Sequence, residues 1–123
     1  MASKNPPPAA PGPIVQDKRK RKVAWCFTMF KGSQGDDWLD KAYASLALLA
    51  DHVDVRNLCF QAEKCPSTGK EHIQGYVRFH KTKYMLTVKD LIGEANMLEA
   101  RGTAAQNLAY CTKTESRFKD PQV

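Results

Sequence analysis

The stretch Glu63-Lys-Cys-Pro-Ser-Thr-Gly-Lys-Glu-His-Ile-Gln-Gly75 decides how this chain folds. It joins two apolar, strand-like runs, residues 59–63 before it and residues 76–79 after it. Its middle is rich in the turn formers proline, serine, threonine and glycine. Two such runs separated by a turn-forming loop are typical of an antiparallel β-hairpin. The stretch therefore predicts that the chain folds around a hairpin.

Side chains alternate between the two faces of a sheet, and this alternation separates a polar from an apolar face of the hairpin. Gln61 and Glu63 share the polar face of the first strand, and His72 and Gln74 share that of the second. If the register is symmetric about the loop, Glu63 lies opposite His72, and Gln61 opposite Gln74, with Cβ atoms within about 5.5 Å. The set Glu63, His72 and Gln74 suits Mg²⁺ or Mn²⁺ and suits zinc poorly. The alternative is an exposed strand face with unrelated polar residues.

Length and composition limit the class of protein. A chain of 123 residues is one domain, large enough for a core. No apolar run reaches the length of a membrane span, and the N-terminus lacks the hydrophobic segment of a signal peptide. The four cysteines form no Cys-x-x-Cys pair, which favours reduced thiols in a cytosolic or nuclear protein. A zinc site made by Cys65 with His52 or His80 is an alternative.

Basic charge is concentrated at the N-terminus, although the whole chain has a net charge of +6. Residues 1–22 contain six Lys or Arg and one Asp, whereas residues 23–123 contain thirteen basic and twelve acidic residues. Five of the seven prolines lie in residues 1–13, so residues 1–22 are predicted to be a disordered tail. Its basic run is typical of a nuclear localisation signal or of an arm that binds phosphates, and a solubilising tail is the alternative.

The segments on either side of the hairpin alternate between strand and helix patterns. The aromatic run at residues 23–30 predicts a first strand, and apolar residues at helical spacing predict a helix over residues 37–51. Thr82 is placed to cap a short helix that ends near Ile92. Residues 95–101 read as a last strand.

A final helix opens with the capping-box pattern Thr103-Ala-Ala-Gln106 and runs through Lys113. The order β-α-β-β-α-β-α predicts an α+β fold of ferredoxin or RRM-like topology, with an antiparallel sheet covered by helices. Tyr110 and Lys113 lie on one face of this helix. A phenol, with a pKa of about 10, is a useful nucleophile only where its phenolate is stabilised and its target is polarised. Taken alone, Tyr110 would be an ordinary half-buried aromatic residue.

Three blocks stand in the order and rough spacing of the rolling-circle replication motifs: Phe27-Thr28, His72-Ile73-Gln74-Gly75 and Tyr110-Cys111-x-Lys113. Over residues 22–116 the chain resembles the N-terminal endonuclease domain of the replication initiator (Rep) of circular single-stranded-DNA viruses, and looks most like the circovirus type. On that resemblance it belongs to the HUH endonucleases, with Gln74 in place of the second histidine.

The resemblance implies a role for each block. Tyr110 would attack the scissile phosphate at the viral origin, keep the 5′ end as a phosphotyrosine and release a 3′-OH for rolling-circle synthesis, with help from Lys113. Glu63, His72 and Gln74 would bind Mg²⁺ or Mn²⁺. The residues that would contact single-stranded DNA of the origin stem-loop are Lys18, Arg19, Lys20, Arg21, Lys22, Phe27 and Thr28.

The resemblance also implies a setting. The chain would act in the host nucleus, as a monomer without membrane contact, and residues 117–123 would begin a linker to a helicase domain. No Gly-x-x-x-x-Gly-Lys-Ser/Thr occurs, so no ATPase is expected in this chain. The first block continues as Met29-Phe30-Lys31 where Leu-Asn-Asn or similar is usual, and Thr114 stands where Glu often follows the lysine.

The rival hypothesis is a non-catalytic single-stranded nucleic-acid-binding module of RRM-like fold, which would stack bases on sheet aromatics. Tyr76 is the only aromatic on the hairpin's polar face.

Overall fold

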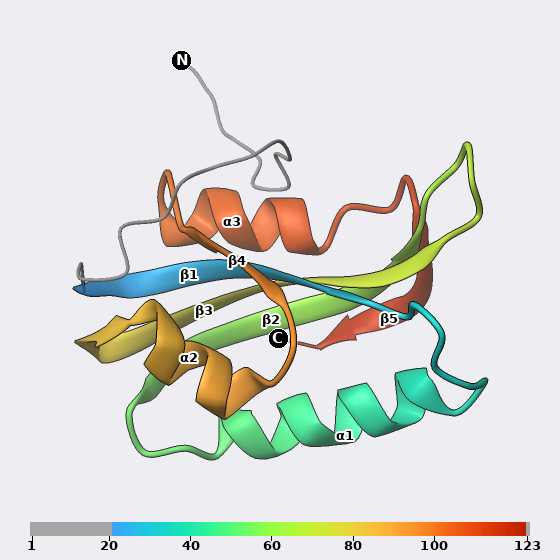
Figure 1. Cartoon of the computed structure of the whole chain (residues 1–123). Helices are drawn as coiled ribbons and strands as arrows, with labels where there is room; N and C mark the ends of the chain where they lie inside the picture. Colours follow the sequence, from blue (N-terminus) through green and yellow to red (C-terminus); the bar gives the residue numbers. More distant parts are fainter. Residues whose placement is uncertain (1–20, 123) are drawn as a thin grey trace.

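Residues 21–122 are described by a computed structural model (Figure 1). Their elements are β1 (Arg21–Phe30), α1 (Trp38–Ala50), β2 (Val55–Lys64), β3 (Glu71–Tyr84), α2 (Met85–Ile92), β4 (Asn96–Glu99), α3 (Ala104–Cys111) and β5 (Arg117–Gln122). The strands form one antiparallel sheet in the order β4-β1-β3-β2-β5. Helices α1 and α2 cover one face and α3 lies on the other (Figure 1). The predicted α+β fold is therefore confirmed.

The register of the hairpin is the symmetric one. Glu63 lies opposite His72, and Gln61 lies opposite Gln74. On the other side of β3, strand β1 brings Thr28 opposite Gln74. Polar residues from three adjacent strands consequently share the face of the sheet that α3 covers.

The main core fills the space between the sheet and helices α1 and α2. Its largest fully buried side chains come from all three central strands and from both helices: Trp25, Phe27, Leu46, Phe60, Ile73, Val77, Phe79 and Val88. Burial of one such aliphatic or phenyl side chain contributes about 1.5–3 kcal/mol. The apolar residues of the central strands face this core. The polar residues at the alternate positions therefore face α3.

Gly75 is required by the packing of this core. Phe27 lies opposite Gly75 in the sheet register, and the phenyl ring covers the glycine. A Cβ atom on residue 75 would lie 2.1 Å from Cζ of Phe27, closer than real Cβ contacts come. The phenylalanine of the first sequence block and the glycine of the second are thus two halves of one contact.

A smaller cluster lies between the sheet and α3. It consists of Cys26, Cys59, Tyr76 and Cys111, all buried. Asn107 of α3 is also buried, and its side-chain amide donates to the carbonyls of Arg101 and Thr103 at 2.8 and 2.9 Å. The Cys26 thiol donates to Oδ1 of Asn107 at 3.2 Å, which ties α3 to β1.

Strand β1 and helix α2 each begin more than one residue away from the predicted start. Strand β1 begins at Arg21, so Arg21 and Lys22 belong to the sheet and not to the predicted tail; the rest of the tail lies outside the described residues. Strand β3 continues to Tyr84, so Thr82 does not cap a helix, and α2 follows without a side-chain cap. The longer β3 is explained by its pairing with the start of β1, where Tyr84 lies opposite Arg21.

Residues 117–122 form strand β5, where we expected the start of a linker. The strand pairs with the outer edge of β2, and Arg117 lies opposite Glu63. The Tyr43 hydroxyl of α1 fastens both strands, because it donates to the carbonyl of Asp120 at 3.0 Å and accepts from the amide of Ala62 at 2.9 Å. Val123 lies outside the described residues.

The four cysteines are free thiols, as predicted. The alternative zinc site is wrong, because Cys65 follows the end of β2, whereas His52 precedes the start of this ten-residue strand and His80 lies beside that start. Within residues 21–122 no group of three His, Cys, Asp or Glu side chains is placed to hold a metal ion. None of the helices in the same range is long and apolar enough to cross a membrane.

Candidate active site

The carboxylate of Glu63 is the centre of the polar face. The residue is only 3% exposed, and three donors reach it. His72 Nε2 lies 3.1 Å from Oε1, while Gln61 Nε2 and Lys113 Nζ donate to Oε2 at 3.0 and 2.6 Å. Burial alone would raise the pKa of Glu63, but the hydrogen bonds of His72, Gln61 and Lys113 and the charge of Lys113 outweigh it and lower the pKa to about 2. Glu63 is therefore ionised at neutral pH.

Gln74 carries a buried polar atom that has no partner. The residue is 2% exposed, and its Oε1 accepts from the Thr28 hydroxyl at 3.2 Å. Its Nε2 finds no hydrogen-bond partner among residues 21–122. Rotation of the Gln74 amide by 180° exchanges the positions of its oxygen and nitrogen. Because a hydroxyl both donates and accepts, Thr28 would still bond to the rotated amide, and the oxygen would then be the atom without a partner. An amide held in this way is suited to bind an additional group.

The spacing of the donor atoms fits a small divalent cation. Glu63 Oε1 and His72 Nε2 are 3.1 Å apart. Adjacent ligands of an octahedral Mg²⁺ with bonds of about 2.1 Å lie roughly 3.0 Å apart. Lys113 and Gln61 both donate to Glu63 Oε2. Oε1, beside His72, is therefore the oxygen that could bind a cation. Gln74, opposite Gln61 in the register, would supply the third ligand.

Lys113 connects Tyr110 with the Glu63 carboxylate. The Lys113 ammonium is 4.3 Å from the centroid of the Tyr110 ring and also bonds to Glu63. Burial, and next the negative charge of Glu63, raise the pKa of Tyr110 to about 12. The Tyr110 phenol therefore keeps its proton at neutral pH. A cation bound near Glu63 would lower its pKa, and a base could remove the proton.

Both ends of α3 are fixed, which sets the position of Tyr110. The predicted capping box is confirmed, with the Gln106 amide donating to Thr103 Oγ1 at 3.0 Å and the Thr103 amide to Gln106 Oε1 at 2.8 Å. Past the other end, Gln61 Nε2 donates to the carbonyl of Lys113 at 2.7 Å. Arg117 donates to the carbonyl of Thr112 and, at 2.9 Å, to Gln61 Oε1.

The predicted DNA-contacting residues lie in different places. Thr28 belongs to the site through Gln74, but Phe27 is 1% exposed and its side chain lies in the core, where it cannot touch DNA. Arg21 lies over the ring of Tyr84, at the end of β1 opposite to the site. Nine residues of strand, about 30 Å, separate Arg21 from the site end of β1. Lys18, Arg19 and Lys20 lie outside the described residues.

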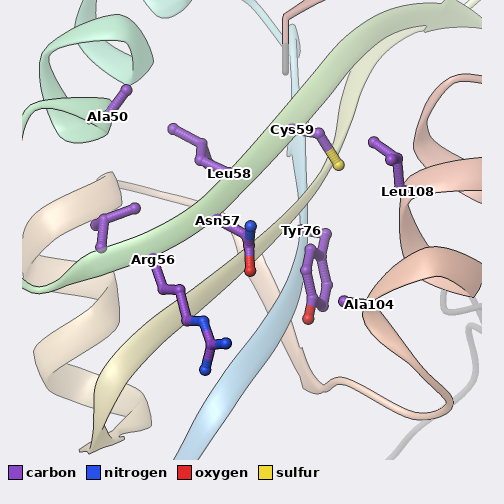
Figure 2. A pocket seen from close by; sticks show the side chains of 9 residues that line it. Ala50, Arg56, Asn57, Leu58, Cys59, Tyr76, Ala104 and Leu108 are labelled. Carbon is purple, nitrogen blue, oxygen red and sulfur yellow. The ribbon is translucent and has the colours of Figure 1, made fainter.

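A separate pocket of about 290 Å³ lies between α1, β2 and the start of α3. Figure 2 shows its wall residues, among them Arg56, Asn57, Tyr76 and Leu108. Neither a candidate metal ligand nor the candidate nucleophile lines it. The candidate site, on the face of the sheet that α3 covers, is therefore separate from this pocket.

Residues 22–114, which hold four of the five strands apart from Arg21 and all three helices, match the family described as "Putative viral replication protein". The chain belongs to this family. It is similar to the Master replication protein of Subterranean clover stunt virus (strain F), with 29% identity over 102 residues that cover 83% of this chain and 31% of the relative. The Master replication protein of Faba bean necrotic yellows virus (isolate Syrian SV292-88) is 28% identical over the same shares of the two chains. Para-Rep C1 of Milk vetch dwarf C1 alphasatellite is 26% identical over 98 residues, 79% of this chain and 30% of the relative.

The chain thus spans about a third of the length of these relatives. The resemblance to a viral replication initiator is confirmed. Its circovirus-type detail is slightly wrong, because the relatives found come from the viruses and the alphasatellite just named.

Proposed function

We propose that this chain is a metal-dependent, sequence-specific single-stranded-DNA endonuclease and strand-transferase that starts rolling-circle replication at a viral origin. The observation that carries the proposal is the position of Lys113. Its ammonium contacts both the Tyr110 ring and the Glu63 carboxylate, so the candidate nucleophile adjoins the candidate metal ligands. Membership of a viral replication protein family supports the same function.

Glu63, His72 and Gln74 would hold Mg²⁺ or Mn²⁺. Such a cation would supply positive charge that polarises and orients the scissile phosphodiester. Thr28 would position the Gln74 amide, and Lys113 would keep the second oxygen of Glu63 occupied. The carboxylate, imidazole and amide match the preference of these cations for oxygen-rich sites.

Tyr110 Oη would attack phosphorus and form a Tyr–O–P bond while the P–O3′ bond breaks. The 3′ oxygen would leave and take up a proton, which gives a free 3′-OH, and the 5′ end would stay on the protein as a phosphotyrosine. Because its pKa is about 12, Tyr110 would lose its proton as the attack proceeds, and the nearby Lys113 ammonium would stabilise the charge that develops. Attack by a 3′-OH on the phosphotyrosine would reverse the reaction and rejoin the strand.

The substrate would be the single-stranded loop of an origin stem-loop. The basic run at residues 18–22 would contact its phosphates and direct the chain to the host nucleus. A helicase domain would follow in the full-length protein, for which the greater length of the relatives leaves room.

The rival hypothesis, a non-catalytic RRM-like binding module, is less well supported. Tyr76, the aromatic that such a module would use on the hairpin, is 3% exposed and lies in the cluster beneath α3. The ionised Glu63 would repel phosphates in the absence of a cation. A nucleic-acid-binding sheet gains its affinity from exposed stacking surfaces, which Tyr76 does not provide.

Calorimetric titration with Mn²⁺ tests the proposed metal site. We expect His72→Ala to weaken Mn²⁺ binding and cleavage of an origin oligonucleotide together. His80→Ala is the matched control, because His80 is an exposed histidine on the same strand beyond the site, and it should change neither. Unchanged Mn²⁺ affinity in His72→Ala would remove His72 from the site.

A further inference from the structure

Phe30 is the most exposed aromatic residue within residues 21–122, with 53% of its surface accessible. It ends β1 and lies opposite His72 in the sheet register. The two ring centroids are 6.0 Å apart, and the ring planes are tilted by 44°. A large apolar ring therefore faces solvent directly beside a candidate metal ligand.

Packing in the interior does not explain why a phenylalanine stands at position 30. It belongs neither to the main core nor to the cluster beneath α3. The other exposed aromatics are each covered by a cation. Arg21 lies 5.5 Å from the ring centroid of Tyr84, and Lys64 lies 5.2 Å from that of Phe118. Phe30 has no such cation among the described residues, so its ring face is free for another group.

The backbone that carries Phe30 is fixed. The Phe30 carbonyl accepts from Gln34 Nε2 at 3.3 Å, and the next amide, that of Lys31, donates to the carbonyl of Glu71 on β3 at 3.1 Å. A ring on an anchored strand end has little freedom to lose when a flat ligand stacks on it. A nucleobase is such a ligand, and base–aromatic stacking is the usual source of affinity in single-strand binding.

We infer that Phe30 is the stacking platform for the nucleobase of a nucleotide adjoining the scissile phosphate, an inference that rests on the proposed function. The ring lies against His72, so a base held on it belongs to the part of the strand that enters the site. Every base has a π-face, and a phenyl ring makes no directional hydrogen bonds to base edges. Phe30 thus contributes affinity and position at this nucleotide and tolerates changes of base identity there.

The test measures stacking without cleavage. Stem-loop oligonucleotides with 2-aminopurine at successive loop positions are titrated with the Tyr110→Phe protein in the presence of Mg²⁺. We expect quenching of the fluorescence at one loop position. Phe30→Ala in this background should remove that quenching and weaken binding by about 5- to 150-fold, the equivalent of 1–3 kcal/mol per stacked base. Phe30→Tyr should retain both.

Leu48→Ala provides the matched control. Leu48 is an apolar residue of α1, 74% exposed, on the other side of the sheet, and its truncation should change neither binding nor quenching. The inference is overturned if Phe30→Ala quenches 2-aminopurine as the parent does and binds within twofold of it. Wild-type protein with Mn²⁺ is assayed in parallel for a covalent adduct. An absent adduct together with Phe30-dependent quenching would overturn the nickase and support the stacking site.

Discussion

Acid should destabilise this protein through Glu63, and Glu63→Gln should remove that sensitivity. Burial opposes ionisation of the carboxyl, but donors from His72, Gln61 and Lys113 lower its pKa from 4.5 to about 2. At 1.36 kcal/mol per pKa unit, this difference contributes about 3 kcal/mol to the free energy of unfolding at pH 7. Because the folded-state pKa is the lower one, the contribution is complete above the unfolded pKa and is lost as the pH falls through about 2. About 1 kcal/mol should remain at pH 3.

Urea denaturation of both proteins at pH 7, 5, 4 and 3, with chelator present, measures this contribution. The difference in unfolding free energy between wild type and Glu63→Gln should shrink by about 2 kcal/mol between pH 7 and pH 3. The hydrogen bond from Lys83 lowers the pKa of Asp54 as well, but Asp54 titrates in both proteins and cancels in the difference. A difference that stays constant across this pH range would refute the conclusion that the three donors hold Glu63 ionised.

Three further substitutions test the packing and the site. Gly75→Ala should lower the free energy of unfolding by about 1–3 kcal/mol, the range for an overpacked core, because the Phe27 ring occupies the place of the new Cβ. Urea denaturation measures this loss, and an unchanged free energy of unfolding would contradict the described packing of Phe27 on Gly75. Thr103→Ala should cost about 1 kcal/mol by removing the cap of α3, and an unchanged melting temperature would argue against the capping box. Lys113→Met removes the 2.6 Å bond to Glu63 and should slow formation of the protein–DNA adduct; an equal rate in a time course would exclude Lys113 from the chemistry.

The hairpin could be predicted because its information is local. The turn-rich loop predicts the hairpin and the alternation predicts its polar face; with a register symmetric about the loop, Glu63 lies opposite His72 and Gln61 opposite Gln74, and the structure has this register. The capping box of α3 is equally local and was predicted at the correct residues. Helix α1 followed from its apolar periodicity.

Strand β5 could not be predicted from its own residues. Arg117–Gln122 contains four polar residues and Pro121, a composition typical of a linker, and it has no apolar alternation. Proline is tolerated at a sheet edge because one side of an edge strand needs no partner. The strand forms through its pairing with β2 and through the Tyr43 hydroxyl, both of which are tertiary contacts.

The supporting contacts of the site, and the part of Arg117 in them, could not be predicted for the same reason, although Thr28 had been named as a DNA-contacting residue. Thr28 reaches Gln74 because β1 pairs with β3, and Arg117 reaches Gln61 because β5 joins β2. Gln61 did carry a signal, since the hairpin register already placed it opposite Gln74 on the polar face. Phe27 was assigned to DNA contact only through its place in the first block of the family resemblance; it shares the apolar face with Trp25, away from Thr28, and is buried.

The most direct test of the proposed function is a denaturing-gel assay of wild-type and Tyr110→Phe protein with labelled single-stranded origin oligonucleotides. With Mn²⁺, wild type should form a product that migrates as a covalent protein–DNA adduct, and chelator should abolish it. Tyr110→Phe lacks one hydroxyl and should bind the same strands without forming the adduct. An adduct or a nick produced by Tyr110→Phe, or no adduct from wild type on any origin sequence with Mn²⁺ or Mg²⁺, would contradict the proposal.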